Sequence, residues 1–110
     1  MSREAIVQAQ LDAYNAQNLD AHCVHFADDV VVANYHGDIV RTGMDAYRAN
    51  YQKVFADFPK NRAVLLNRMA VRDTVIDHEH VDRGDGSAPF HVLAIYTFNG
   101  DKIARVDFAR

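Results

Sequence analysis

The chain has 110 residues, the size of one ordinary domain, and we treat residues 1–110 as a single folding unit. Its composition, 49% hydrophobic and 25% charged, is typical of a globular protein and excludes a disordered or fibrous chain. The net charge of −3 and the scattered Lys and Arg residues argue against nucleic acid as a partner. No apolar run approaches the ~20 residues of a membrane span, so no membrane partner is expected.

The first ten residues and the cysteine content bear on location. Met1–Gln10 lacks a basic region followed by an apolar stretch, so it does not resemble a secretion signal. The one cysteine, Cys23, can form no internal disulfide, and we expect it to be buried and inert. A reducing cytoplasm is therefore the expected location.

Two amphipathic helices are predicted at the start of the chain. The first runs from about Ser2 to Ala16, with Ser2 as its N-cap. Its stripe at helical spacing is apolar except for one glutamine, and contains Val7, Gln10, Leu11 and Tyr14. After a break at Asn15–Asn18, a short second helix carries a stripe made of Leu19, His22, Cys23 and Phe26.

A short hairpin and a third helix follow. Val30 begins a β-branched strand that continues to about Tyr35, and Ile39–Arg41 returns after a turn. Thr42 and Asp45 resemble a capping box that opens the third helix. Pro59 ends this helix, whose apolar positions are Met44, Tyr47, Tyr51, Val54, Phe55 and Phe58.

The rest of the chain is predicted to be strand. The expected segments are 62–72, 75–82, 90–99 and 103–109, and Asn99-Gly100 is a strong hairpin signal between the last two. Helices gathered at the front and strands at the back indicate an α+β fold, in which the helices cover one face of a curved antiparallel sheet.

This order of elements resembles the nuclear-transport-factor-2-like (NTF2-like) superfamily, and specifically its SnoaL-like and ketosteroid-isomerase-like branch. The local matches are Tyr14-Asn15-Ala16 with Leu19-Asp20, Phe26-Ala27-Asp28-Asp29, Arg41-Thr42-Gly43, Asn67-Arg68, Val75-Ile76-Asp77-His78-Glu79 and Phe98-Asn99-Gly100 with Lys102-Ile103. The resemblance implies a cone-shaped cystatin-like or NTF2-like roll, in which a curved antiparallel sheet is covered by three N-terminal helices. It also implies a deep apolar cavity for a small molecule, and a homodimer formed through the outer face of the sheet.

The residues that a ketosteroid isomerase uses are changed in this chain. By the resemblance, the position of the carboxylate base falls on Asn34, that of the tyrosine donor on Gln10, and that of the protonated Asp on Ala94. Asparagine accepts no proton near neutral pH, so we reject the strict steroid-isomerase mechanism. Gln10 and Asn34 could still orient a ligand carbonyl in the pocket.

The densest group of ionisable residues is Asp77-His78-Glu79-His80. Strand alternation places Asp77 and Glu79 on one face, and His78 and His80 on the other. Three interpretations stay open: a strand with one solvated face, a catalytic general acid or base at His78 or Asp77, and a metal site completed by His91. We select His78 and Asp77 as the catalytic candidates and predict no metal.

The remaining pocket candidates have structural alternatives. His22, Tyr14, Tyr51 and Tyr96 are either pocket walls or ordinary core residues. Arg68 either forms an ion pair with an acid such as Asp77 or Asp107, or anchors a substrate carboxylate or enolate. We therefore expect a pocket lined by Gln10, Tyr14, His22, Asn34, Tyr51, Arg68, Ala94 and Tyr96.

No phosphate loop, nucleophile elbow, metalloprotease helix motif or zinc-type cysteine pattern is present, so no cofactor is indicated. Two functions follow. The first is a cofactor-independent enzyme, of isomerase, cyclase, hydrolase or lyase type, that uses general acid–base chemistry on a compact apolar carbonyl metabolite. The second is a non-catalytic ligand-binding or dimerisation module of the same fold.

Overall fold

The computed structural model describes residues 1–110 and contains three helices and six strands in the predicted order. The helices are α1 (Arg3–Asn15), α2 (Leu19–Cys23) and α3 (Met44–Asp57). The strands are β1 (Phe26–Asn34), β2 (Ile39–Thr42), β3 (Arg62–Val71), β4 (Thr74–Asp82), β5 (Phe90–Asn99) and β6 (Lys102–Ala109). None of the helices is both long and apolar enough to cross a membrane.

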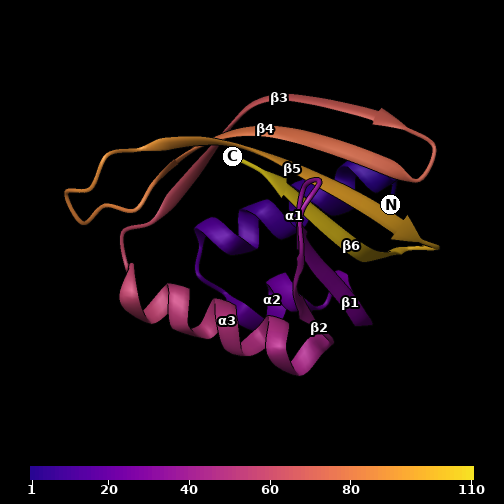
Figure 1. The fold of residues 1–110 in the computed structure, drawn as a ribbon, viewed down its shortest axis with the longest axis horizontal. Helices are drawn as coiled ribbons and strands as arrows, with labels where there is room; N and C mark the ends of the chain where they lie inside the picture. The colour runs from indigo at the N-terminus through magenta and orange to yellow at the C-terminus, as the bar shows by residue number, and fades with distance from the viewer.

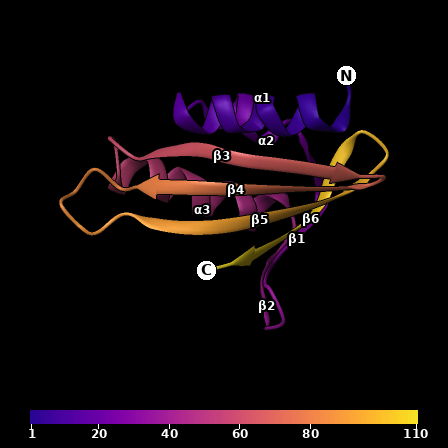
Figure 2. The same ribbon diagram turned by 90° about the horizontal axis from the view of Figure 1, so that it is seen from above.

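The six strands form one curved, open sheet in the order β2-β1-β6-β5-β4-β3. All three helices lie on the inner, concave side of the sheet (Figure 1). The view from above shows the outer side of β3, β4 and β5, which no helix covers (Figure 2). The α+β roll is thus as predicted, but the sheet is mixed because β1 and β6 pair in parallel. A parallel pair needs a long connection, and here most of the chain lies between the two strands.

Two local predictions at the ends of elements were wrong. Phe26 does not continue α2 but opens β1, where it pairs with Ile103. Thr42 and Asp45 form no capping box: Gly43 is the N-cap of α3 and no side chain caps this helix. Gly43 has a φ of 90°, a conformation that glycine adopts freely and other residues avoid. The Ser2 cap on α1 is confirmed by its bond from Ala5 N.

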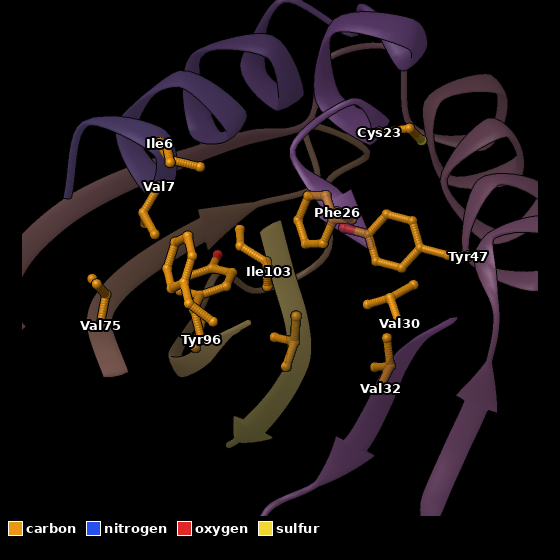
Figure 3. Close-up of a cluster of buried hydrophobic side chains, with 13 residues drawn as sticks. Ile6, Val7, Cys23, Phe26, Val30, Val32, Tyr47, Val75, Tyr96 and Ile103 are labelled. Atoms are coloured by element: carbon orange, nitrogen blue, oxygen red, sulfur yellow. The ribbon is translucent and has the colours of Figure 1, made fainter. Parts of the chain in front are cut away.

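The main core packs α1, α2 and α3 against the inner face of the sheet (Figure 3). It contains the N-terminal half of α1, with Val7 fully buried, and the middle of the sheet, with Ile103 fully buried. Cys23 is buried and free, as predicted. Leu11, from the C-terminal half of α1, packs in a second buried cluster with Ala63, Val81 and Val92.

Candidate functional site

A cavity of about 370 Å³ lies between the helices and the inner face of the sheet. Its wall comes from all three helices and from every strand except β3, and 13 of its 21 lining residues are hydrophobic. This volume and this mixture of apolar walls with a few polar groups are typical of small-molecule sites.

The structure places most of the expected pocket residues in this wall. They are Gln10, Tyr14, His22, Asn34, Tyr51 and Tyr96. Asn34 is exposed and therefore lies at the mouth rather than in the depth of the cavity. The other two expected residues, Arg68 and Ala94, are not part of the wall. Ala94 is fully buried and pairs across the strands with Asp77.

Asp77, one of the two catalytic candidates, is held in an ion pair with Arg68. Arg68 Nε lies 2.6 Å from Asp77 Oδ1, and Nη2 lies 2.9 Å from Oδ2. The Asp77 side chain is fully buried, and the two-point contact satisfies both of its oxygens. The predicted ion pair is therefore present. Asp77 faces inward but is not among the residues that line the cavity.

His78, the other catalytic candidate, lies on the outer face of the sheet. It shares that face with His80, and its Nε2 is 2.9 Å from Nδ1 of His91. The predicted alternation is thus present, with the acids inside and the histidines outside. No group of three or more His, Cys, Asp or Glu side chains is arranged to hold a metal ion. The sheet separates His78 from the cavity, and His78 does not line it.

The acidic residue of the cavity wall is Glu79, which sequence reasoning did not select. Glu79 is 7% exposed, and its Oε2 atom is buried without a hydrogen-bond partner. Burial raises the pKa of this carboxyl to about 7, and the negative charge of Asp77 adds to the effect while Arg68 opposes it. Strand alternation puts Glu79 on the same face of β4 as Asp77, and this could have made Glu79 a candidate. The sequence does not show, however, that this face is the one that the helices cover.

Tyr96 and Gln10 form the polar pair of the cavity floor. Gln10 Nε2 donates a hydrogen bond to the Tyr96 hydroxyl at 3.0 Å. No protein atom accepts a bond from that hydroxyl, so its own proton remains free for a ligand. Burial and the nearby Glu79 raise the pKa of Tyr96 well above its ordinary value, which keeps it protonated.

His22 is locked in one neutral tautomer by two partners. Its Nδ1 lies 2.9 Å from the Gln10 carbonyl, which can only accept, so Nδ1 carries the proton. Its Nε2 then accepts from the Tyr47 hydroxyl at 2.7 Å. Burial lowers the pKa of His22 to about 4, so the ring is a neutral part of the wall near pH 7 rather than a proton carrier.

Three arginines also contribute to the wall. Arg83 donates through Nη1 to Asn61 Oδ1 at 2.9 Å and to the Tyr14 hydroxyl at 3.4 Å. Arg41 reaches the cavity from β2, and Arg110 follows β6. None of the three takes part in a salt bridge, since the ion pairs of the chain involve other arginines and one lysine.

Solved structures share this cystatin-like roll. An uncharacterized cystatin-fold protein from Novosphingobium aromaticivorans is 41% identical, with a TM-score of 0.94 over 100% of this chain and 99% of that one. A proposed polyketide cyclase from Sinorhizobium meliloti is 21% identical, with a TM-score of 0.82 over 98% and 99%. A proposed ketosteroid isomerase from Kribbella flavida is 15% identical, with a TM-score of 0.82 over 97% and 76%.

The family model of the SnoaL-like domain matches residues 7–106. The chain therefore belongs to the SnoaL-like family, as its sequence resemblance indicated. No functionally curated protein matches the sequence. The two structures with low identity are similar to this chain in fold only.

Proposed function

We propose that this protein is a cofactor-independent enzyme that uses general acid–base chemistry on a compact, largely apolar carbonyl metabolite. One observation carries the proposal: Glu79 presents a buried carboxyl, with one oxygen unpartnered, to a mostly apolar cavity. A pKa of about 7 suits a group that must both take and return a proton near neutral pH. Glu79 thus replaces His78 and Asp77 as the proposed proton carrier.

The proposed step is a proton transfer next to the carbonyl group. Ionised Glu79 takes a proton from the carbon beside the carbonyl, and the C–H electron pair moves into an enolate. The Tyr96 hydroxyl, held by Gln10, donates a hydrogen bond to the carbonyl oxygen as negative charge develops there. Glu79 then returns the proton to the same carbon or to a conjugated one. This chemistry differs from the strict steroid-isomerase arrangement, because Asn34 and Ala94 carry no carboxyl group.

Deuterium exchange tests the proposal without knowledge of the product. Pocket-sized cyclic ketones and enones would be incubated with the protein in D2O and followed by NMR. Wild-type protein should accelerate exchange beside the carbonyl, and E79Q should lose this activity by about a hundredfold or more. H78Q, altered on the outer face, is the matched control and should keep it. Equal exchange by E79Q and wild type would exclude Glu79 as the base.

A second candidate is a ligand-binding protein without catalysis. The observation that favours it is the loss of carboxyl groups at Asn34 and Ala94, where the resemblance expects two of the three isomerase groups. In this case calorimetry should detect binding of the same ketones, and none of them should exchange its protons faster with the protein than in buffer alone.

We further propose that the protein is a cytoplasmic homodimer. The location is inferred from the single cysteine. The dimer follows from the family resemblance, and large apolar side chains on the outer face support it: Val64, Met69, Val71 and Leu93 are 40–71% exposed. A surface with this apolar content is typical of an interface.

A further inference from the structure

The charges of the cavity wall are unbalanced. Arg41, Arg83 and Arg110 line it, and Glu79 is the only acidic residue among the 21 lining residues. No carboxylate lies within ion-pair distance of any of the three guanidinium groups. A concave, mostly apolar wall concentrates the field of such cations and favours an anionic ligand.

Arg83 is the best placed of the three to bind an anion directly. It is half-buried and donates to protein acceptors only through Nη1, to Asn61 and Tyr14. Its Nε and Nη2 therefore remain without protein acceptors, and these two atoms form the edge of a guanidinium that binds a carboxylate at two points. Asp85, an acid whose charge interacts with that of Arg83, is exposed and accepts hydrogen bonds from Ser87 instead.

Aromatic rings hold this guanidinium in place. The Arg83 Cζ atom lies 5.0 Å from the Phe58 ring centroid and 5.4 Å from that of Phe90. Arg110 Cζ lies 3.5 Å from the same Phe90 ring, so two cations gather around one aromatic side chain. Contacts with ring faces stabilise a cation without neutralising its charge. The Phe58 and Phe90 rings therefore position the Arg83 guanidinium, and its positive charge remains available to a ligand.

We infer that the natural ligand is a carboxylate anion with an apolar body, whose carboxylate binds the Nε–Nη2 edge of Arg83 while Arg41 and Arg110 add positive field. The apolar body then extends along Tyr14, which contacts Arg83 through its hydroxyl, toward Glu79 and Tyr96. The substrate class becomes a compact keto or enone acid rather than a neutral ketone. Because this subsite belongs to the cavity proposed above as the reaction site, the substrate class rests on that proposed function.

Three probes that share one naphthalene ring system test the carboxylate subsite by calorimetry: 2-naphthoate, the isosteric neutral 2-naphthamide, and the tetrahedral 2-naphthylphosphonate. Wild-type protein should bind the naphthoate about tenfold or more tightly than the amide, as charge-assisted bonds are the stronger ones. R83Q should lose this preference and still bind the amide, which shows that its cavity is intact. R83K should keep part of the preference for naphthoate, because lysine retains the positive charge but cannot bind a carboxylate at two points. R105Q, on the outer face, should behave as wild type.

Several results would overturn the assignment. They are equal affinity for naphthoate and amide, a preference that survives in R83Q, or tighter binding of the phosphonate than of the carboxylate. Failure of the proposed function has a different signature. In that case naphthoate selectivity depends on Arg83, but no carbonyl compound exchanges its protons in a Glu79-dependent manner. The reverse result is Glu79-dependent exchange of neutral ketones without selectivity for the carboxylate. It would refute the carboxylate subsite but not the proposed proton transfer.

Discussion

Glu79 on β4 and Ala94 on β5 occupy diagonal positions on the inner face of the sheet, because Asp77 pairs with Ala94 and Glu79 pairs with Val92. Diagonal neighbours on adjacent strands are within reach of a long side chain. The family resemblance assigns a protonated carboxyl to the position of Ala94. This chain has no carboxyl group at position 94, but Glu79 presents one from the neighbouring strand. Glu79 lines the cavity, whereas Ala94 does not.

Replacing Glu79 by Gln should stabilise the protein at alkaline pH. The pKa of Glu79 in the folded protein is about 7, above its ordinary value of 4.5. Between these values the folded chain binds more protons than the unfolded chain, so the stability of wild type falls as pH rises through this window. The loss amounts to at most about 3 kcal/mol. Urea unfolding should show E79Q gaining on wild type between about pH 4.5 and 7. An E79Q variant whose free energy of unfolding gains nothing on that of wild type over this range would contradict the account.

His22 should stay neutral well below the pH at which an ordinary histidine is charged. Its pKa is about 4 against an ordinary 6.5, so the stability that depends on the neutral ring is lost only as pH falls through this window. Long-range ¹⁵N–¹H NMR of the ring should show a protonated Nδ1 and an unprotonated Nε2 at about pH 5.5. A charged ring at that pH would refute the hydrogen-bond assignment to Gln10 and Tyr47.

Breaking the Arg68–Asp77 ion pair should cost far more stability than breaking an exposed one. The Asp77 side chain is fully buried and that of Arg68 is 16% exposed, so R68M leaves a buried charge unpaired and should lose about 3–5 kcal/mol. R105Q breaks the pair with Asp107, where the arginine is 43% exposed, and should lose less than about 1 kcal/mol. Urea unfolding of both variants measures the difference. Similar losses would mean that burial does not govern these pairs.

A charge on the outer face should dissociate the proposed homodimer. Leu93 is 40% exposed at the centre of this face, between His78 of β4 and Ala109 of β6. L93K should convert a dimer into a folded monomer in sedimentation equilibrium, because an unpaired buried charge destabilises an interface. V24K, which changes an exposed apolar residue outside the sheet, is the matched control. A wild-type protein that sediments as a monomer would refute the dimer itself.

The sequence predicted the inner wall well wherever the periodicity of one element decides the question. Helical spacing placed Gln10 and Tyr14 on the covered stripe of α1, and both line the cavity. Strand alternation likewise separated Asp77 from His78. These predictions need only the backbone geometry of a single helix or strand.

The choice between the two faces of β4 could not be made in this way. Asp77 with Glu79, and His78 with His80, are two equally polar sets, and either could face solvent. Only the packing of α1 and the ion pair from Arg68 on β3 decide that the acids are inside. The parallel β1–β6 pair was missed for a similar reason, since it depends on contacts between segments far apart in the chain.

The most direct test of the central claim is a ¹³C NMR titration of the Glu79 carboxyl. The chain has only two glutamates, and Glu4 is exposed at the start of α1, so glutamate-selective labelling gives two signals with an internal reference. E79Q assigns them, because it removes one. The account predicts that the Glu79 signal titrates near pH 7. A Glu79 carboxyl that titrates at its ordinary pKa of 4.5 would contradict the account, because Glu79 would then be an ordinary solvated acid rather than a proton carrier in the cavity.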